Sequence, residues 1–189
     1  MSRVLLSGAA GFIGSWLAEA LHDRGHEVYG ADSCVGGRNT VPGVPLIVGD
    51  LADHAFARHA VDATRPEVLV HCASDPREGC SWYRLDSVTH NNMAAYCSII
   101  EACLRRKLAK VVMLSSMSVY GDHAPPFNED MPRQPVDPYG VNKAAIEQIT
   151  WQMSDAHAFE AVILRPHNVI GTRQFPDPVR NVAMIFCNQ

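Results

Sequence analysis

Residues 3–14 read RVLLSGAAGFIG, a short apolar run followed at once by three glycines in the spacing GxxGxxG. The run Arg3–Ser7 predicts a buried β-strand, and the apolar spacing from Phe12 to Arg24 predicts an amphipathic helix that stops at Gly25. Glycines at this spacing between a strand and a helix are typical of a turn that binds the pyrophosphate of a dinucleotide. A purely structural turn is the alternative.

The three glycines have different expected roles. Gly8 permits a tight turn, Gly11 lets the backbone approach the pyrophosphate, and Gly14 lets the helix pack on the strand. The amides of Phe12 and Ile13 would face the phosphates from the positive end of the helix. We therefore expect these five residues to bind a dinucleotide cofactor.

Strands and helices are expected to alternate along the whole chain. The expected strands are Arg3–Ser7, Glu27–Ala31, Leu46–Val48, Val68–Cys72, Val111–Ser115 and Ala161–Leu164. The expected helices are Phe12–Arg24, Asp53–Val61, Thr89–Lys107 and Tyr139–Phe159, with a loop and a short helix at the end. This alternation of apolar strands with helices indicates an α/β domain with a doubly wound parallel sheet. Ligands then bind at the carboxyl ends of the strands, and the long loop 117–137 is favoured as a functional loop.

Composition places the chain among globular proteins. It has 189 residues, of which 47% are hydrophobic and 19% charged, enough to bury the core of one domain and part of a second. The formal net charge of -4 gives no electrostatic reason to expect nucleic acid or an anionic membrane as a partner. The apolar stretches fall far below the ~20 residues that cross a bilayer, and Met1–Leu6 contains no cationic leader. These features predict a soluble, cytoplasmic protein.

The cysteines and histidines form no pattern of a metal site. The six cysteines include no CxxC pair, and several lie among apolar residues, as reduced thiols do in cytosolic proteins. The nine histidines include no HExxH motif, and Gly25 interrupts the pair His22 and His26. We therefore predict that the protein binds no metal.

Two aspartates follow expected strands. Asp32 lies 18 residues beyond Gly14, where a carboxylate accepts hydrogen bonds from the adenosine ribose and repels a 2′-phosphate, which favours NAD over NADP. An ordinary turn aspartate is the alternative, and Arg38 could instead hold a phosphate. Asp50 and Leu51 are expected to border the adenine, with a helix N-cap role as the rival interpretation.

The strongest catalytic signal is Tyr139-Gly-Val-Asn-Lys143, because residues four apart share one helix face and place the ammonium beside the phenol. The ordinary tyrosine pKa of about 10 is too high for a base at neutral pH. A lysine and the positive charge of a bound nicotinamide would lower that pKa toward the working range. YxxxK alone is common by chance, but here it follows the glycine turn and a strand that ends in Ser115-Ser116.

With these motifs in order, the chain resembles the extended short-chain dehydrogenase/reductase superfamily, and within it the NAD-dependent nucleotide-sugar epimerase/dehydratase family. The resemblance runs essentially from end to end. It rests on GAAGFIG at 8–14, Asp32, Asp50-Leu51, HCAS at 71–74, SSMSVYG at 115–121, PYGVNK at 138–143 and LRPHNVIG at 164–171. It implies a Rossmann-like NAD-binding domain.

The resemblance also implies roles for individual residues. Ser116 would be the catalytic serine, Tyr139 the acid/base, and Lys143 the residue that lowers the tyrosine pKa and holds the nicotinamide ribose. The residues placed against NAD by the resemblance are Cys72, Ala73, Ser74 and Asn91. Asn168 would lie near the phosphates of the sugar nucleotide.

Three of these residues also have structural interpretations. Asn91 could start a helix, Cys72 could belong to the core, and Asn168 could stabilise a turn. The sequence leaves both interpretations open.

The residues after Ser116 bear on the reaction. Family dehydratases typically carry an Asp-Glu pair there and decarboxylases a glutamate, whereas this chain has Met117-Ser118. Elimination needs an acidic proton donor or acceptor beyond the tyrosine, so the sequence favours 4-epimerisation of a UDP-hexose or UDP-hexuronate through a 4-keto intermediate. A dehydratase, decarboxylase or reductase of the same family, or a truncated NAD-binding module without turnover, are the alternatives.

Two departures from the family pattern stand out. Ile170-Gly171-Thr172-Arg173 stands where many relatives have Tyr-Gly-Pro-Arg, and Trp16 replaces the histidine that is frequent after GFIGS. Arg173 is a candidate to bind a carboxylate or phosphate of the substrate, whereas the change at Trp16 is expected to affect packing.

The resemblance implies how the chain is divided. Residues 1–170 would form the NAD-binding domain, and residues 171–189 would begin a substrate-binding region that is largely absent. It also implies a homodimer that forms through the helices 89–107 and 139–159.

Overall fold

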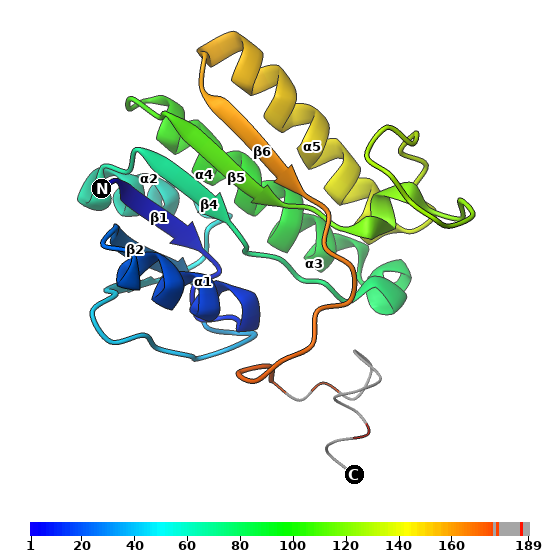
Figure 1. Ribbon diagram of the computed structural model, residues 1–189, viewed down its shortest axis with the longest axis horizontal. Helices are drawn as coiled ribbons and strands as arrows, with labels where there is room; N and C mark the ends of the chain where they lie inside the picture. The colour runs from blue at the N-terminus through cyan, green and yellow to red at the C-terminus, as the bar shows by residue number, and fades with distance from the viewer. Residues whose placement is uncertain (176, 178–185, 187–189) are drawn as a thin grey trace.

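Six parallel strands form one sheet in the computed structural model, which describes residues 1–175, 177 and 186 (Figure 1). The strands are β1 (Arg3–Ser7), β2 (Glu27–Asp32), β3 (Leu46–Val48), β4 (Val68–His71), β5 (Lys110–Leu114) and β6 (Glu160–Leu164). Their order across the sheet is β3-β2-β1-β4-β5-β6. The predicted doubly wound parallel sheet is therefore confirmed, and its strand order reverses between β1 and β4.

Helices connect the strands nearly where the sequence predicts them. They are α1 (Phe12–Asp23), α2 (His54–Thr64), α3 (Leu85–Thr89), α4 (Ala95–Leu104) and α5 (Pro138–His157). The long helix expected over 89–107 is corrected: it begins earlier as α3, passes through a π-turn at His90–Ala94 (η2), and continues as α4. Two short 3-10 turns, Glu78–Tyr83 (η1) and Met117–Tyr120 (η3), were not expected. The short helix expected at the end of the chain falls mainly outside the described residues.

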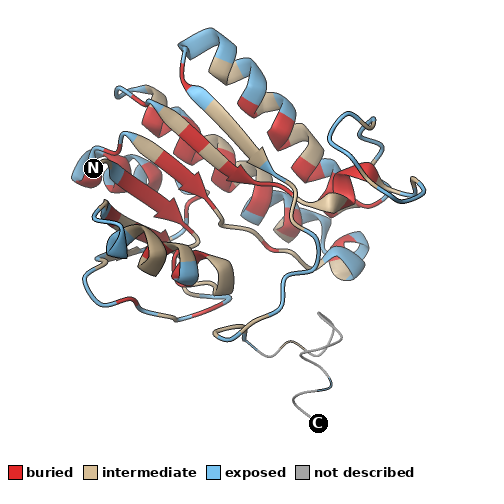
Figure 2. Cartoon of the chain, in the orientation of Figure 1, coloured by how far each residue is buried: buried red, intermediate tan, exposed pale blue. Residues whose placement is uncertain are grey.

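The sheet has two differently covered faces (Figure 1). Helices α2, α4 and α5 cover one face, whereas α1 packs on the other. Side chains alternate between the two cores as a β-strand requires, because Leu5 belongs to the first core while Val4 and Leu6 belong to the second. The central strands β1 and β4 are largely buried, and β6 at the edge is only partly covered (Figure 2).

Aspartates fix the starts of two helices. Asp53 caps α2 by accepting hydrogen bonds from the amides of Ala55 and Phe56 at 2.7 and 3.4 Å. Asp137 caps α5 in the same way, with Gly140 as the donor at 3.0 Å and Pro138 in the first turn. The second cap determines where the helix that carries Tyr139 begins.

Within the described part of the chain, no helix combines the length and the hydrophobicity that a membrane crossing needs. The five cysteines that the structure describes are free thiols, and Cys187 lies outside the described residues.

Candidate functional site

The glycine turn lies where β1, β2 and β4 end. Gly8 adopts a φ of +75° and donates its N–H to the Ala31 carbonyl at 2.8 Å. A Cβ on Gly8 would lie 2.6 Å from the amide nitrogen of Ala73, and a Cβ on Gly14 would overlap the Gly8 carbonyl. The close approach of turn, helix and neighbouring strand therefore requires glycine at both positions.

The first turn of α1 leaves backbone donors available. Gly11 caps the helix without a side-chain hydrogen bond, and the first helical bond runs from Ser15 N–H to the Gly11 carbonyl at 3.0 Å. The N–H groups of Phe12, Ile13 and Gly14 have no acceptor among the residues that the structure describes. Unpaired N–H groups at the positive end of a helix form a site for an anion such as a pyrophosphate.

Asp32 lies at the end of β2 beside this turn, as predicted. Its two carboxylate oxygens accept hydrogen bonds from the amides of Ala10 at 2.9 Å and Cys34 at 2.7 Å. Each oxygen has a further lone pair for a ribose hydroxyl. Arg38 is exposed on the loop that follows, so the alternative of a phosphate partner stays open.

Asp50 and Leu51 are adjacent, but Asp50 is exposed and Leu51 is buried. Asp50 pairs with His90 at 2.8 Å and accepts the amide of Ala52 at 2.8 Å. Partial burial opposes ionisation of Asp50, but the hydrogen bonds from His90 and the Ala52 amide, together with the charge of His90, outweigh it and lower the Asp50 pKa. Leu51 is buried in the core, and the helix N-cap is Asp53 rather than Asp50.

The loop after β4 is tied to Asn92, a residue that the sequence analysis missed. Asn92 is fully buried, and its side-chain oxygen accepts the hydroxyl of Ser74 at 2.6 Å and the amide of Asp75 at 3.1 Å. The predicted Asn91 is exposed in the π-turn. Helix phase could have distinguished the two, because Asn92 shares the buried face with Val88 and Tyr96, four residues away on either side.

Cys72 directly follows β4 and interacts electrostatically with Lys143. Burial raises the pKa of its thiol to about 12, although Lys143 opposes that rise. The thiol is therefore neutral at physiological pH. The preceding residue, His71, is fully buried with its Nδ1 2.8 Å from the Ser7 hydroxyl, and burial lowers the His71 pKa to about 3.

Ser116 and Tyr139 come from elements that pack directly on each other. The Ser116 hydroxyl caps η3 by accepting the Ser118 amide at 3.1 Å, and the two serine hydroxyl oxygens lie 3.0 Å apart. A Cβ on Gly140 would lie 2.8 Å from the Ser118 carbonyl, so the glycine after Tyr139 lets the first turn of α5 rest on η3.

Lys143 is almost completely buried and lies one helical turn beyond Tyr139. Its Nζ lies 5.7 Å from the centre of the Tyr139 ring and donates to the Leu114 carbonyl at 2.9 Å. Burial lowers the Lys143 pKa to about 8, and Cys72 and Glu147 partly oppose that shift. At neutral pH the ammonium form therefore predominates, and a cation beside a phenol favours the phenolate.

A second missed residue, Glu147, lies one further turn along the same face of α5. Its fully buried carboxylate accepts the Ser115 hydroxyl and two guanidinium groups, Arg165 at 2.8 and 3.0 Å and Arg133 at 3.2 Å. Burial would raise the Glu147 pKa, but these hydrogen bonds outweigh it and lower the pKa. In the sequence, the spacing KxxxE from Lys143 to Glu147 was the signal that could have placed Glu147 on the same helix face.

The two expected substrate residues follow β6. Asn168 is exposed, and its amide donates to the ring of His167 at 2.8 Å. The Arg173 guanidinium is bound to α1, where it contacts Glu19 at 2.8 Å and stacks 4.0 Å from the Trp16 ring centre. The side chain predicted to meet the substrate is thus engaged by the protein itself in this structure.

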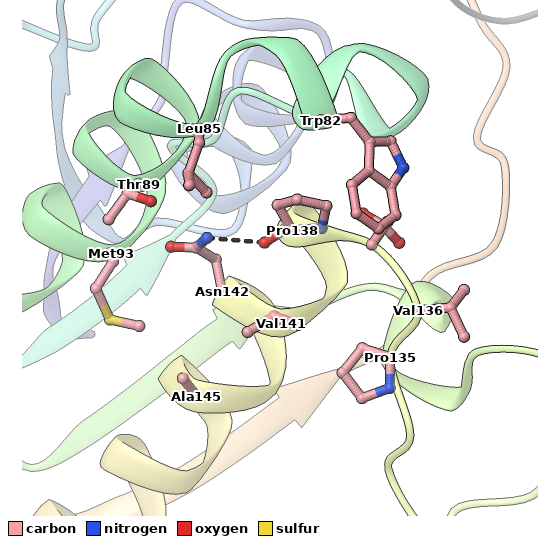
Figure 3. Close-up of a pocket in the computed structure, with 11 residues that line it drawn as sticks. Trp82, Leu85, Thr89, Met93, Pro135, Val136, Pro138, Val141, Asn142 and Ala145 are labelled. Atoms are coloured by element: carbon pink, nitrogen blue, oxygen red, sulfur yellow. Dashed lines mark hydrogen bonds between the residues drawn. The ribbon is translucent and has the colours of Figure 1, made fainter.

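An apolar cavity of about 450 Å³ lies between α5 and the segment that contains η1 and α3 (Figure 3). Trp82, Leu85 and Met93 face Val141 and Ala145 across it. Neither Tyr139 nor Lys143 lines this cavity, so it is separate from the predicted catalytic residues. Among the residues that the structure describes, no cluster of three or more His, Cys, Asp or Glu side chains could hold a metal.

Comparison with known proteins places this geometry in a family. The model of the NAD dependent epimerase/dehydratase family matches residues 4–189. UDP-glucose 4-epimerase of Azospirillum brasilense is 35% identical over 172 residues, which cover 89% of this chain and 49% of that protein. The dTDP-D-glucose 4,6-dehydratase of Mus musculus is 28% identical over 188 residues, covering 94% of this chain and 53% of that protein.

A solved structure is also similar to this chain over nearly its whole length. The crystal structure of Thermus thermophilus UDP-glucose 4-epimerase in complex with NAD superimposes with a TM-score of 0.91 at 31% identity, covering 98% of this chain and 60% of that one. The chain spans about half the length of the curated relatives it matches. The family match, the sheet order and the assembled Ser116, Tyr139 and Lys143 together show that the chain belongs to the NAD-dependent epimerase/dehydratase family.

Proposed function

We propose that this chain carries the NAD-binding and catalytic part of a nucleotide-sugar 4-epimerase. The glycine turn fits the cofactor, because its crowded backbone excludes side chains and the N–H groups of Phe12 and Ile13 have no acceptor in the described structure. Asp32 would bind the adenosine ribose, and Lys143 the nicotinamide ribose. NAD, when bound, supplies an acceptor and donor of hydride at C4 of the sugar.

Tyr139 and Ser116 would perform the proton chemistry. The ammonium of Lys143, 5.7 Å from the phenol ring, favours the phenolate that removes the proton of the sugar 4-hydroxyl. Ser116 would donate a hydrogen bond to the 4-oxygen as it becomes a carbonyl. When the 4-keto sugar turns its other face, Tyr139 returns the proton, and the configuration at C4 is inverted with no net oxidation.

The observation that favours epimerisation over elimination is the set of side chains around Ser116. The hydroxyl of Ser118 lies 3.0 Å from it, where a dehydratase would have an acidic group. A buried carboxylate beside Ser115 is that of Glu147 on α5, which is bound to two arginines and the Ser115 hydroxyl. With its pKa lowered, Glu147 cannot serve as the proton donor that elimination requires.

The proposal is tested by incubating the NAD-loaded protein with UDP-glucose, UDP-N-acetylglucosamine and UDP-glucuronate in separate reactions. Proton NMR of the sugar ring should show inversion at C4 for one of these substrates, with no external NADH consumed. Accumulation of a 4-keto-6-deoxy sugar would identify a dehydratase, and consumption of NADPH a reductase. A protein that binds NAD but converts none of the three would be a module without turnover.

We also predict a cytoplasmic location, a division of the chain at residue 170, and a homodimer formed through the helices 89–107 and 139–159. The cavity in Figure 3 supports the homodimer, because exposed Trp82, Leu85 and Val141 border it on or beside those helices. Covering these apolar side chains would be a favourable consequence of association.

A further inference from the structure

The two departures from the family pattern contact each other, although they are 156 residues apart in the sequence. The indole Nε1 of Trp16 donates to the Thr172 carbonyl at 3.1 Å. The guanidinium of Arg173 lies 4.0 Å from the centre of the Trp16 ring. Stacking of an arginine on an indole is a favourable cation–π contact.

Arg173 is bound to α1 by two further interactions. Its Nη2 lies 2.8 Å from the Glu19 carboxylate, and its Nη1 donates to the Ser15 carbonyl at 3.1 Å. The backbone of Arg173 adopts a φ of +68°, a conformation that residues other than glycine rarely adopt. Such a conformation persists where surrounding contacts hold it. We call Trp16, Glu19 and Arg173 the latch.

The latch holds a segment that crosses the edge of the sheet where the strands end, which is where the cofactor is proposed to bind. The chain leaves β6 and runs past the carboxyl ends of the strands to α1 (Figure 1). We call residues 165–175 the strap. At Gly171 the strap touches the Phe12 ring so closely that a Cβ would lie 3.0 Å from it.

Asn39 connects the strap to the glycine turn itself. Its side-chain amide donates to the Arg173 carbonyl at 3.0 Å and to the Ala10 carbonyl at 3.2 Å. The strap is therefore attached on two sides of the first turn of α1, whose N–H groups are the proposed pyrophosphate site.

We propose that the latch retains the dinucleotide, by holding the strap against the phosphate-binding turn so that release requires the latch to open. This inference rests on the proposed binding of NAD at that turn. Retention serves the proposed reaction, because a cofactor that left between the two hydride transfers would strand the sugar as a ketone. Each round of epimerisation therefore needs the reduced cofactor to stay bound.

The test measures how fast the cofactor leaves, independently of turnover. The full chain is loaded with NADH and mixed with excess NAD in a stopped-flow instrument, and the fluorescence change gives the dissociation rate. Arg173→Ala removes the stacking, the ion pair and the carbonyl contact at once, so release should be about tenfold faster. Glu19→Gln and Trp16→Phe each remove one interaction and should accelerate release about two- to threefold.

Arg24→Ala is the matched control, because Arg24 follows α1 and its side chain bonds only to the Ala20 carbonyl among the described contacts. Its release rate should equal that of the wild type. Circular dichroism would show that each variant is folded, and the two milder variants keep the test valid should Arg173→Ala be unstable.

Two outcomes would overturn the inference, and they differ. If the wild type binds NADH and all three latch variants release it at the wild-type rate, the latch has no retaining role while the proposed function stands. If the wild type does not bind NADH at all, the proposed cofactor site fails and the latch inference fails with it.

Discussion

Lys143 donates a hydrogen bond from Nζ to the carbonyl of Leu114 at 2.9 Å. Leu114 is the last residue of β5 and lies two residues before Ser116. The same helix therefore presents Tyr139 to the site and is held in register with the strand that leads to Ser116. Glu147 repeats the attachment one turn later through the Ser115 hydroxyl.

Tyr139→Phe should lower the rate of C4 inversion by about 10²–10⁴-fold, because it removes the proposed acid/base and leaves the buried ring in place. The measurement is NMR of the epimerised UDP-sugar. Tyr83→Phe is the control. Because Tyr83 is 90% exposed, this variant should invert C4 at the wild-type rate. Wild-type turnover in Tyr139→Phe with every tested sugar would contradict the assignment.

Lys143 should make stability depend on pH. Burial lowers its pKa from 10.5 to about 8, so between these values the unfolded chain binds more protons than the folded one, and stability from this group rises with pH. The full effect corresponds to about 3 kcal/mol. Denaturant unfolding at pH 7.5 and 9.5 covers part of this window, and the contribution of Lys143 should rise between them by about 2 kcal/mol. Lys143→Met should lack this increment, and equal increments in both proteins would refute the prediction.

Glu147→Gln should destabilise the protein by about 3–5 kcal/mol, because it leaves two guanidinium groups without their buried anion. Urea unfolding provides the measurement. The control is Glu160→Gln, whose partner Lys110 is at the surface, and its effect should stay within about 1 kcal/mol. Similar losses in the two variants would mean that the buried cluster contributes no more than a surface pair.

Ser118→Ala should reduce kcat about three- to tenfold with little change in KM, since the Ser118 hydroxyl lies 3.0 Å from that of Ser116 and orients it. Ser118→Thr retains the hydroxyl and should recover most of the activity. The comparison uses steady-state epimerisation kinetics. A change confined to KM would show that Ser118 acts on substrate binding instead.

Gly14→Ala should destabilise the fold by about 1–3 kcal/mol and weaken NAD binding, because the added Cβ overlaps the Gly8 carbonyl. Gly36→Ala is the matched control, since a Cβ there meets no atom within 4 Å. Thermal unfolding and NAD titration of both variants would separate steric conflict from a general effect of replacing glycine. Equal behaviour of the two would disprove the crowding argument.

Local patterns in the sequence were sufficient for the fold and for part of the site. The apolar runs predicted all six strands: the central strands are buried on both faces and are therefore apolar along their length, and the partly covered edge strands β3 and β6 are still mostly apolar. The glycine turn could also be predicted from the sequence, since steric crowding at Gly8 and Gly14 admits no other residue. The pair Tyr139 and Lys143 followed from helix geometry alone.

The sequence by itself thus determined the strand pattern, the glycine turn and the helix face that carries Tyr139 and Lys143. Only the tertiary structure decided that Asn92 binds Ser74 in the loop after β4, that Glu147 accepts the Ser115 hydroxyl, and that Arg173 stacks on Trp16. The partners in these contacts are 18, 32 and 157 residues apart in the chain. Periodicity and glycine sterics act between near neighbours, whereas such contacts exist only after the sheet has brought distant segments together.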